Sequence, residues 1–180
     1  GSAVTAYSTE GSTQCIKAML ALAAKRTGGR PKFLAARNVH KAFIYGVAYL
    51  DAEVEWIFPE PAENGDSYNI CRCMVTKEML EKALSETEPP TAIYVTSPDY
   101  LGNMLDIRGL SEVAHRHGTL LLVDNAHGAY LHFLKEPCHP LDLGADMCSD
   151  SAHKTLPVLT GGAYLHFAKD APAAFADRAS

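Results

Sequence analysis

Short apolar segments that alternate with segments of helical periodicity constrain the fold of this chain more than any other feature. Residues 92–96 (AIYVT) and 119–123 (TLLLV) are almost wholly apolar, and residues 33–36 (FLAA) form a shorter run of the same kind. Strands that are apolar on both faces are typical of a parallel sheet covered by helices on both sides, because water reaches neither face. The sequence therefore predicts an α/β fold of three layers, αβα, around a mainly parallel sheet.

The remaining elements follow from periodicity and turn signals. Helices are predicted where apolar side chains recur at intervals of three and four residues, at 14–24, 41–50, 76–86 and 107–117. Further strands are expected at 53–58, 146–150 and 162–167, with one strand antiparallel to the others. Residues 61–71 are rich in turn formers and are interpreted as a surface excursion. The whole chain, residues 1–180, is thus predicted to form one domain.

Composition narrows the classes of partner. The chain is 47% hydrophobic with a net charge of −5, and its 16 basic residues are scattered rather than blocked, which argues against nucleic acid or an anionic membrane. No apolar run approaches the roughly 20 residues of a membrane span, and no secretory signal is recognised. The five cysteines lack the spacing of a disulfide framework or a zinc site. We therefore expect a cytoplasmic protein with reduced thiols that acts on a small molecule.

Polar residues follow the predicted strands at the points where those strands end. In open α/β sheets, ligands bind at the carboxyl ends of the strands. The residues in question are Asp124 after TLLLV, Asp99 after AIYVTSP, His40 after FLAA, and Ser151, His153 and Lys154 after the strand at 146–150. Gly11, Ser12 and Thr13 precede a predicted helix, whose free amide groups and dipole favour a phosphate.

Together these side chains supply what a phosphorylated aldehyde cofactor needs. A lysine forms the imine, an anion faces the protonated ring nitrogen, a flat side chain covers the ring, and hydroxyl and amide groups hold the phosphate. Each residue also has a plainer structural interpretation. These are a solvated charge for Lys154, a cap for Asp124, a partly buried polar side chain for His40, and a helix cap for Gly11, Ser12 and Thr13.

At these positions the chain resembles the major domain of the ornithine/lysine/arginine decarboxylases, which are pyridoxal-phosphate enzymes with the aspartate-aminotransferase fold (fold type I). The matching segments are TEGSTQCIKAML, ARNVHKAFIYG, YVTSPDYLGNMLDI, LLVDNAHGAY and SDSAHKTLPVLTGGAYLHF. They span nearly the whole chain, and the last of them is the most specific.

The resemblance implies a role for each matched residue in binding pyridoxal 5'-phosphate. Lys154 would form the Schiff base with the cofactor, Asp124 would face the pyridine nitrogen, and His40 would stack on the ring. Ala126 would pack on the other face of the ring. The phosphate would be bound or bordered by Ser12, Thr13, Ser151 and His153.

The other histidines carry weaker signals. His127, in the pattern Asp-x-Ala-His-Gly, is interpreted as a contact to substrate or cofactor, or as an anchor of its loop. No recognisable metal set is formed along the sequence by His115, His117, His132, His139 and His166. We therefore predict no metal.

The resemblance implies decarboxylation of lysine, arginine or ornithine to the amine and CO2, a reaction that feeds polyamine biosynthesis, in a homodimer or larger assembly. Family members carry further terminal segments, so we expect this chain to be part of a longer protein and to turn over substrate weakly or not at all.

Other functions remain open on the same residues. Aminotransfer, aldol cleavage or another lyase reaction would use the same lysine and aspartate. A non-catalytic remnant that binds partners or itself is a further alternative. A nucleotide-binding domain ranks last, because both a Gly-x-Gly-x-x-Gly and a Walker lysine motif are missing.

Overall fold

The computed structural model describes residues 2–59, 73–136 and 138–169. Its strands form one sheet in the order β1-β7-β6-β5-β4-β2-β3. The strands are β1 (Ser2–Ser8), β2 (Lys32–Ala36), β3 (Glu53–Ile57), β4 (Ala92–Thr96), β5 (Leu120–Asp124), β6 (Met147–Asp150) and β7 (Ala163–Ala168). The helices are α1 (Ser12–Ala24), α2 (Lys41–Tyr49), α3 (Lys77–Ser85), α4 (Ile107–Arg116) and α5 (Ala152–Thr155), with 3-10 turns η1 (Ala129–Phe133) and η2 (Pro140–Leu143).

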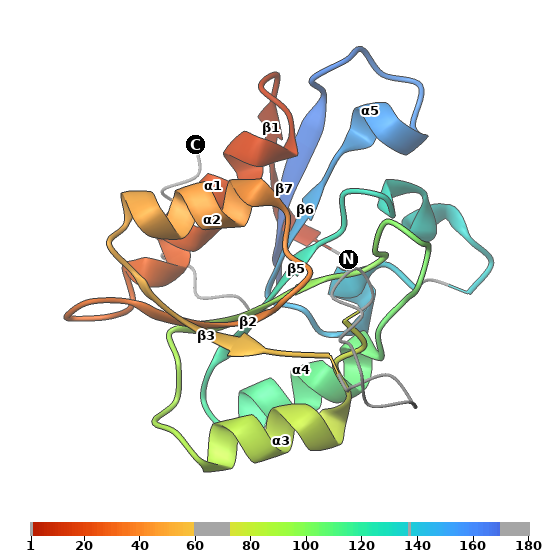
Figure 1. Cartoon of the computed structure of the whole chain (residues 1–180). Coiled ribbons are helices and arrows are strands. Elements are labelled where there is room, and N and C mark those ends of the chain that lie inside the picture. The colour runs from red at the N-terminus through yellow and green to blue at the C-terminus, as the bar shows by residue number, and fades with distance from the viewer. Residues whose placement is uncertain (1, 60–72, 137, 170–180) are drawn as a thin grey trace.

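The sheet is mainly parallel and is covered on both faces. Strands β3, β2, β4, β5 and β6 pair in parallel, whereas β7 runs antiparallel to both β6 and β1. In Figure 1, α1 and α2 lie together on one face of the sheet, and α3 and α4 lie together on the other. The structure thus confirms the predicted three-layer αβα fold with one antiparallel strand.

The two apolar cores lie on opposite faces of the central strands. In β5, Leu120 and Leu122 belong to the core beneath α1 and α2, whereas Leu121 and Val123 belong to the core beneath α3 and α4. Because side chains alternate between the faces of a strand, a strand that serves two cores is apolar at every position. This is why the run TLLLV was such a clear strand signal.

The observed elements differ from the prediction mainly at the amino terminus. Strand β1 was not predicted, because it is an edge strand that pairs only with β7 and its residues are mostly half-buried or exposed. Helix α1 begins at Ser12 rather than at residue 14, directly after Gly11 with its positive φ of 76°. Residues 61–71, the predicted surface excursion, lie outside the described part of the chain.

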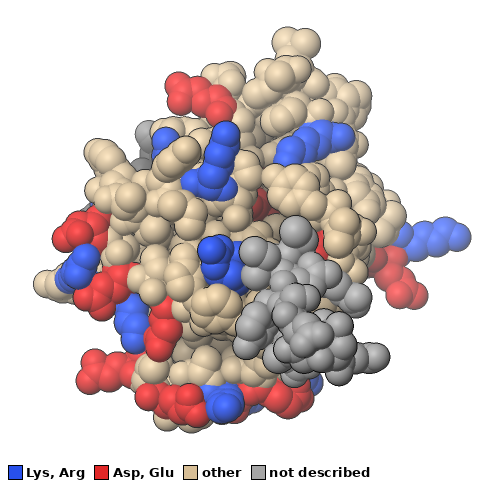
Figure 2. Space-filling model, viewed as in Figure 1, with Lys and Arg blue, Asp and Glu red and all other residues tan. Residues whose placement is uncertain are grey.

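The described surface carries charges of both signs side by side. On the face shown in Figure 2, the blue and red side chains are interspersed. Several are paired, as in the contacts of Lys32 with Glu55 and of Arg116 with Glu81. Among the described helices, none combines the length and the apolar character that crossing a bilayer requires.

Candidate functional site

A small pocket opens at the carboxyl ends of β4 and β5, next to the first residues of α1 and α2. Thr96 ends β4 and Asp124 ends β5, and these two residues are direct partners in the parallel ladder. The pocket is lined by Ser12, His40, Thr96, Tyr100, Asp124, Ala126, His127 and Lys154. The fold therefore brings together side chains from segments that are more than a hundred residues apart in sequence, and most of them were predicted as site residues.

Asp124 is a buried carboxylate that is held from two sides. Its Oδ2 accepts a hydrogen bond from the Tyr94 hydroxyl at 3.2 Å, and its Oδ1 accepts one from the Ala126 amide at 3.2 Å. Burial raises the pKa of Asp124, although both hydrogen bonds and the charge of Lys154 act in the opposite direction. A carboxylate with few protein donors in a dry site can accept a further hydrogen bond from a cationic ligand group.

Lys154 presents its amine to the same pocket. It lies on α5, the single helical turn that follows β6, and its Nζ is 3.1 Å from Nε2 of His127. Burial, followed by the charge of Lys154, lowers the pKa of His127, so the imidazole is neutral and accepts a hydrogen bond from the amine. No described carboxylate forms an ion pair with Lys154, which leaves the amine available to a carbonyl ligand.

His40 is the N-cap of α2, and this role fixes its ring against the pocket. Nδ1 of the ring accepts a hydrogen bond from the Ala42 amide at 3.2 Å. Burial and the nearby charges of Lys154 and Lys41 lower the pKa of His40. A neutral, flat ring at the wall of the pocket is compatible with the predicted stacking on an aromatic cofactor.

The start of α1 forms the polar end of the pocket. Gly11 is its N-cap and supplies no side-chain hydrogen bond, so amide groups of the first turn are left for another acceptor. The Ser151 hydroxyl donates to the Ser12 hydroxyl at 2.6 Å and so joins the segment after β6 to the start of α1. Of the predicted phosphate residues, Ser12 lines the pocket, and Ser151 is joined to the pocket only through its hydrogen bond to Ser12.

The other two predicted phosphate residues lie outside the pocket lining. Thr13 belongs to the first turn of α1. Nδ1 of His153 is 3.0 Å from the Gly162 carbonyl oxygen, a contact that ties α5 to the start of β7. The side chain of His153 thus contacts the backbone just before β7 and not the start of α1, where the phosphate was predicted.

Three residues of the site were not predicted: Thr96, Tyr100 and Tyr94. The Thr96 Oγ1 is buried without a hydrogen-bond partner among the described residues, although it lines the pocket. A buried hydroxyl without a partner is one that a polar ligand atom would satisfy. The Tyr100 ring packs edge-on against His127 with centroids 4.9 Å apart. Only strand pairing could have found Thr96 and Tyr94, because both look like ordinary strand residues in the sequence.

Asp99 was noted as a polar residue after β4, but the structure gives it a local role. Its Oδ1 accepts hydrogen bonds from the amides of Leu101 and Asn103 at 2.8 and 2.9 Å. The side chain thus stabilises the turn after β4, in the manner of an Asx turn, and it is not part of the pocket lining.

Comparison with known sequences gives a family match over nearly the whole chain. The family model described as "Orn/Lys/Arg decarboxylase, major domain" matches residues 1–178. An arginine decarboxylase of Bacillus subtilis is 32% identical over 164 residues, which cover 90% of this chain and 32% of that protein. The uncharacterized protein YaaO of the same organism is 35% identical over 136 residues, 74% of this chain and 27% of that protein. The chain thus spans about a third of these relatives.

Solved structures share the fold at low sequence identity. Oryza sativa TDC, crystallised with PLP, has a TM-score of 0.74 and 18% identity over 91% of this chain and 38% of that chain. Sphingosine-1-phosphate lyase from Burkholderia pseudomallei has a TM-score of 0.72 and 21% identity over 95% of this chain and 39% of that chain. These neighbours have the fold of the fold-type-I enzymes, and the matched family uses pyridoxal phosphate, the ligand in the Oryza sativa structure. The chain belongs to the Orn/Lys/Arg decarboxylase family, whose major domain it matches.

Proposed function

We propose that the pocket binds pyridoxal 5'-phosphate and that Lys154 is the residue attached to it. The observation that carries this proposal is the convergence of the Lys154 amine and the buried Asp124 carboxylate in one pocket. The Thr96 hydroxyl, which has no hydrogen-bond partner among the described residues, and the start of α1, which has no side-chain cap, are polar groups that a phosphorylated ring would satisfy. The residues present therefore fit the cofactor of the family.

Each residue has a distinct task in this proposal. Asp124 keeps a proton on the ring nitrogen through a charge-assisted hydrogen bond, and Tyr94 holds that carboxylate in place. The ring of His40 covers the cofactor. His127 accepts a hydrogen bond from Lys154 and so orients its amine in the pocket. Ser12 and Ser151 hold the phosphate together with the amides of α1.

We further propose that the reaction is decarboxylation of a basic amino acid to the amine and CO2. Bound pyridoxal phosphate supplies an electron sink for the pair released at the α-carbon. Asp124 would sustain this sink by stabilising the positive charge of the ring, and Lys154 would be the residue that holds the cofactor in the pocket. Family membership and the arginine decarboxylases among the relatives favour arginine, with lysine and ornithine as the other candidates.

The test is product analysis of the purified protein with pyridoxal phosphate and each of the three amino acids. Because turnover by this chain alone is expected to be weak at most, any product should be CO2 and the matching amine at low yield, with none from Lys154→Ala. Binding is followed in parallel by the change in visible absorbance of the bound cofactor on adding amino acid, since substrate can bind even where turnover is slow. A 2-oxo acid product would instead show aminotransfer. A cofactor spectrum that none of the three amino acids alters would refute the proposed substrate class.

We also propose that the protein acts as a homodimer or larger assembly in the cytoplasm. Large apolar side chains are exposed on the segments that follow β4, β5 and β6, among them Tyr100, Phe133 and Leu159. Exposed apolar groups of this kind are common at subunit contacts. The four described cysteines are unpaired, which fits a reducing compartment. Sedimentation analysis should give at least twice the mass of one chain, and a monomer at micromolar concentration would contradict the assembly.

A further inference from the structure

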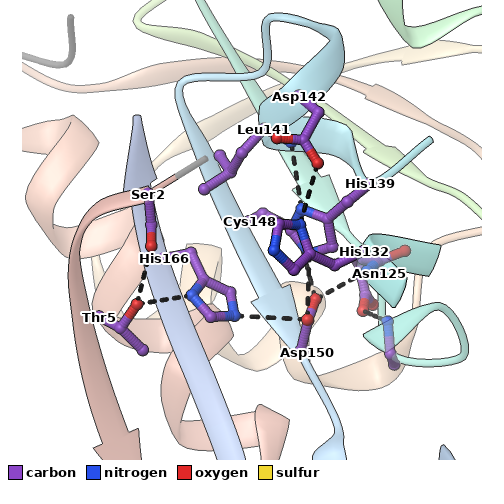
Figure 3. A network of polar contacts seen from close by, with 12 residues as sticks. Ser2, Thr5, Asn125, His132, His139, Leu141, Asp142, Cys148, Asp150 and His166 are labelled. Carbon is purple, nitrogen blue, oxygen red and sulfur yellow. Dashed lines mark hydrogen bonds and ion pairs between the residues drawn. The ribbon is translucent and has the colours of Figure 1, made fainter. Parts of the chain in front are cut away.

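A second polar cluster lies apart from the proposed cofactor site and is used by none of the roles described so far. It consists of His139, which precedes η2, Asp150, which ends β6, and His166 in β7 (Figure 3). Asp150 Oδ2 is 3.1 Å from Nε2 of His139 and 3.4 Å from Nε2 of His166. All three atoms lie within 4.8 Å of one another, so one point in space is within reach of each.

The cluster is on the opposite face of the sheet from Lys154 and Asp124. In β6, Met147 belongs to the core beneath α1 and α2, whereas Cys148 belongs to the other core. Asp150 has the same parity as Cys148, so its side chain emerges on the α4 face. The sequence analysis recognised no metal set among the histidines. The antiparallel pairing of β7 with β6 brings His166 to Asp150.

The distances suit a metal ion at the centre of the three groups. Zinc binds histidine nitrogen and carboxylate oxygen at about 2.0–2.2 Å in a tetrahedron. Two such ligands are then about 3.3–3.5 Å apart, by the geometry of the tetrahedron. The two separations from Asp150 Oδ2, 3.1 and 3.4 Å, are close to this value, and the ligand atoms of the two histidines lie within 4.8 Å of each other. Two imidazoles and one carboxylate are a ligand set that suits zinc and its neighbours in the first transition row.

The surrounding residues hold the proposed ligands in orientation. Asp150 Oδ1 accepts a hydrogen bond from Asn125 Nδ2 at 2.7 Å, which leaves Oδ2 to face the two histidines. Nδ1 of His166 is 2.8 Å from the Thr5 hydroxyl, an acceptor for the ring N–H, so Nε2 of that ring can present its lone pair. Such outer hydrogen bonds are typical of metal-binding histidines and carboxylates.

His139 requires one rearrangement. Its Nδ1 accepts from the Leu141 amide at 3.4 Å, which places the proton of the neutral ring on Nε2, where it is donated to Asp150. To bind a metal through Nε2, the ring shifts this proton to Nδ1 and gives up the long contact with Leu141. No net proton is released in this step.

A pocket of about 340 Å³ adjoins the cluster and is lined by His139, Asp150 and His166, together with Tyr164, Leu156 and Ser2. It supplies an entry path and leaves room for a water molecule as a fourth ligand. We propose that His139, Asp150 and His166 bind one divalent transition-metal ion, with zinc as the preferred ion. The fourth coordination position would face the pocket.

The experiment is metal titration of chelator-stripped protein. Zinc binding is measured by calorimetry, and Co2+ is used as a spectroscopic probe because tetrahedral cobalt absorbs strongly in the visible range. We expect one ion per chain and visible cobalt bands that added zinc abolishes. Asp150→Asn, His139→Gln and His166→Gln should each weaken binding at least about tenfold. His115→Gln is the matched control, because His115 also contacts a carboxylate, Asp146 at 3.0 Å, but belongs to no group of three metal-binding side chains in the described part of the chain.

If a variant fails to fold, the cobalt spectrum and the zinc titration of the unsubstituted protein still test whether the metal binds. Absence of stoichiometric uptake by the unsubstituted protein, or uptake that His115→Gln weakens as much as Asp150→Asn does, would overturn the proposal. The cluster would then be a hydrogen-bonded support for β6 and β7. Lys154→Ala should bind zinc unchanged, so failure of the cofactor proposal would leave this result unaffected, and the two proposals can fail separately.

Discussion

The Tyr94 hydroxyl donates a hydrogen bond to Asp124 at 3.2 Å, from one parallel strand to its neighbour, and both side chains are buried. Burial, together with the adjacent Asp124, raises the pKa of Tyr94 well above its ordinary value, so the phenol remains a donor at every physiological pH. The Asp124 carboxylate is therefore oriented before any ligand arrives.

Replacing Tyr94 by Phe should weaken binding of pyridoxal phosphate about tenfold. The substitution removes one of the two donors to Asp124, and hydrogen bonds to charged groups contribute about 1.5–3 kcal/mol. The hydrogen bond also stabilises the protein without cofactor, so only part of its energy contributes to cofactor binding. The expected loss of affinity therefore corresponds to the lower end of this energy range. Absorbance titration measures it. Tyr164→Phe, in β7, is the control, and equal affinity in Tyr94→Phe and the control would contradict the role of Tyr94.

Asp124→Asn should weaken cofactor binding strongly but stabilise the cofactor-free protein at neutral pH. Burial raises the pKa of Asp124, which means that the folded state is more stable when this carboxyl group is protonated. This stability is present at low pH and is lost as the pH rises through the pKa of the folded state. Asparagine avoids this cost because it cannot ionise. In a domain of this size, each kcal/mol corresponds to about 2–4 °C in Tm. A lower Tm for Asp124→Asn at pH 7 would contradict this account.

The pH dependence of stability should reflect His40 and His127. Burial lowers the pKa of both rings below the ordinary value of 6.5, so the folded protein favours the neutral rings. This stability is fully present above pH 6.5 and is lost as the pH falls through the lowered pKa values of the folded state. The double variant His40→Asn, His127→Gln should therefore lose less unfolding free energy than the wild type between about pH 7.5 and 5.5. Urea denaturation at both pH values measures the difference, and parallel losses would contradict it.

Ser151→Ala should weaken binding of pyridoxal phosphate while leaving binding of pyridoxal, which lacks the phosphate, nearly unchanged. Ser151 donates to Ser12 at the start of α1, where we place the phosphate. Loss of one such hydrogen bond costs about 1 kcal/mol, or roughly fivefold in affinity. Equal weakening for both ligands would mean that Ser151 acts on the fold rather than on the phosphate. Ser85→Ala, at the end of α3, is the control.

The central fold was predictable because its strands serve two cores. Leu120 to Val123 had to be apolar at every position, and Asp124 was conspicuous as the charge at their end. Strand β1 was not predictable, because an edge strand buries little and so carries no clear pattern.

Some residues of the candidate site could likewise be predicted from the sequence, and others could not. Lys154 and Asp124 were found because polar residues after apolar strands gather at one edge of a parallel sheet. Thr96 became part of the site only through its register with Asp124 in the ladder. His166 met Asp150 only through the pairing of β7 with β6. Pairing between strands is a long-range property, and local residue patterns do not record it.

The most direct test of the account is to reduce the protein with borohydride in the presence of pyridoxal phosphate and to map the modified peptide by mass spectrometry. Reduction makes the bond between the cofactor and its lysine permanent. We predict a single stoichiometric adduct on Lys154, which disappears in Lys154→Ala and is weakened in Asp124→Asn. An adduct spread over surface lysines, or one that persists in Lys154→Ala, would contradict the central claim that this pocket is built to hold the cofactor on Lys154.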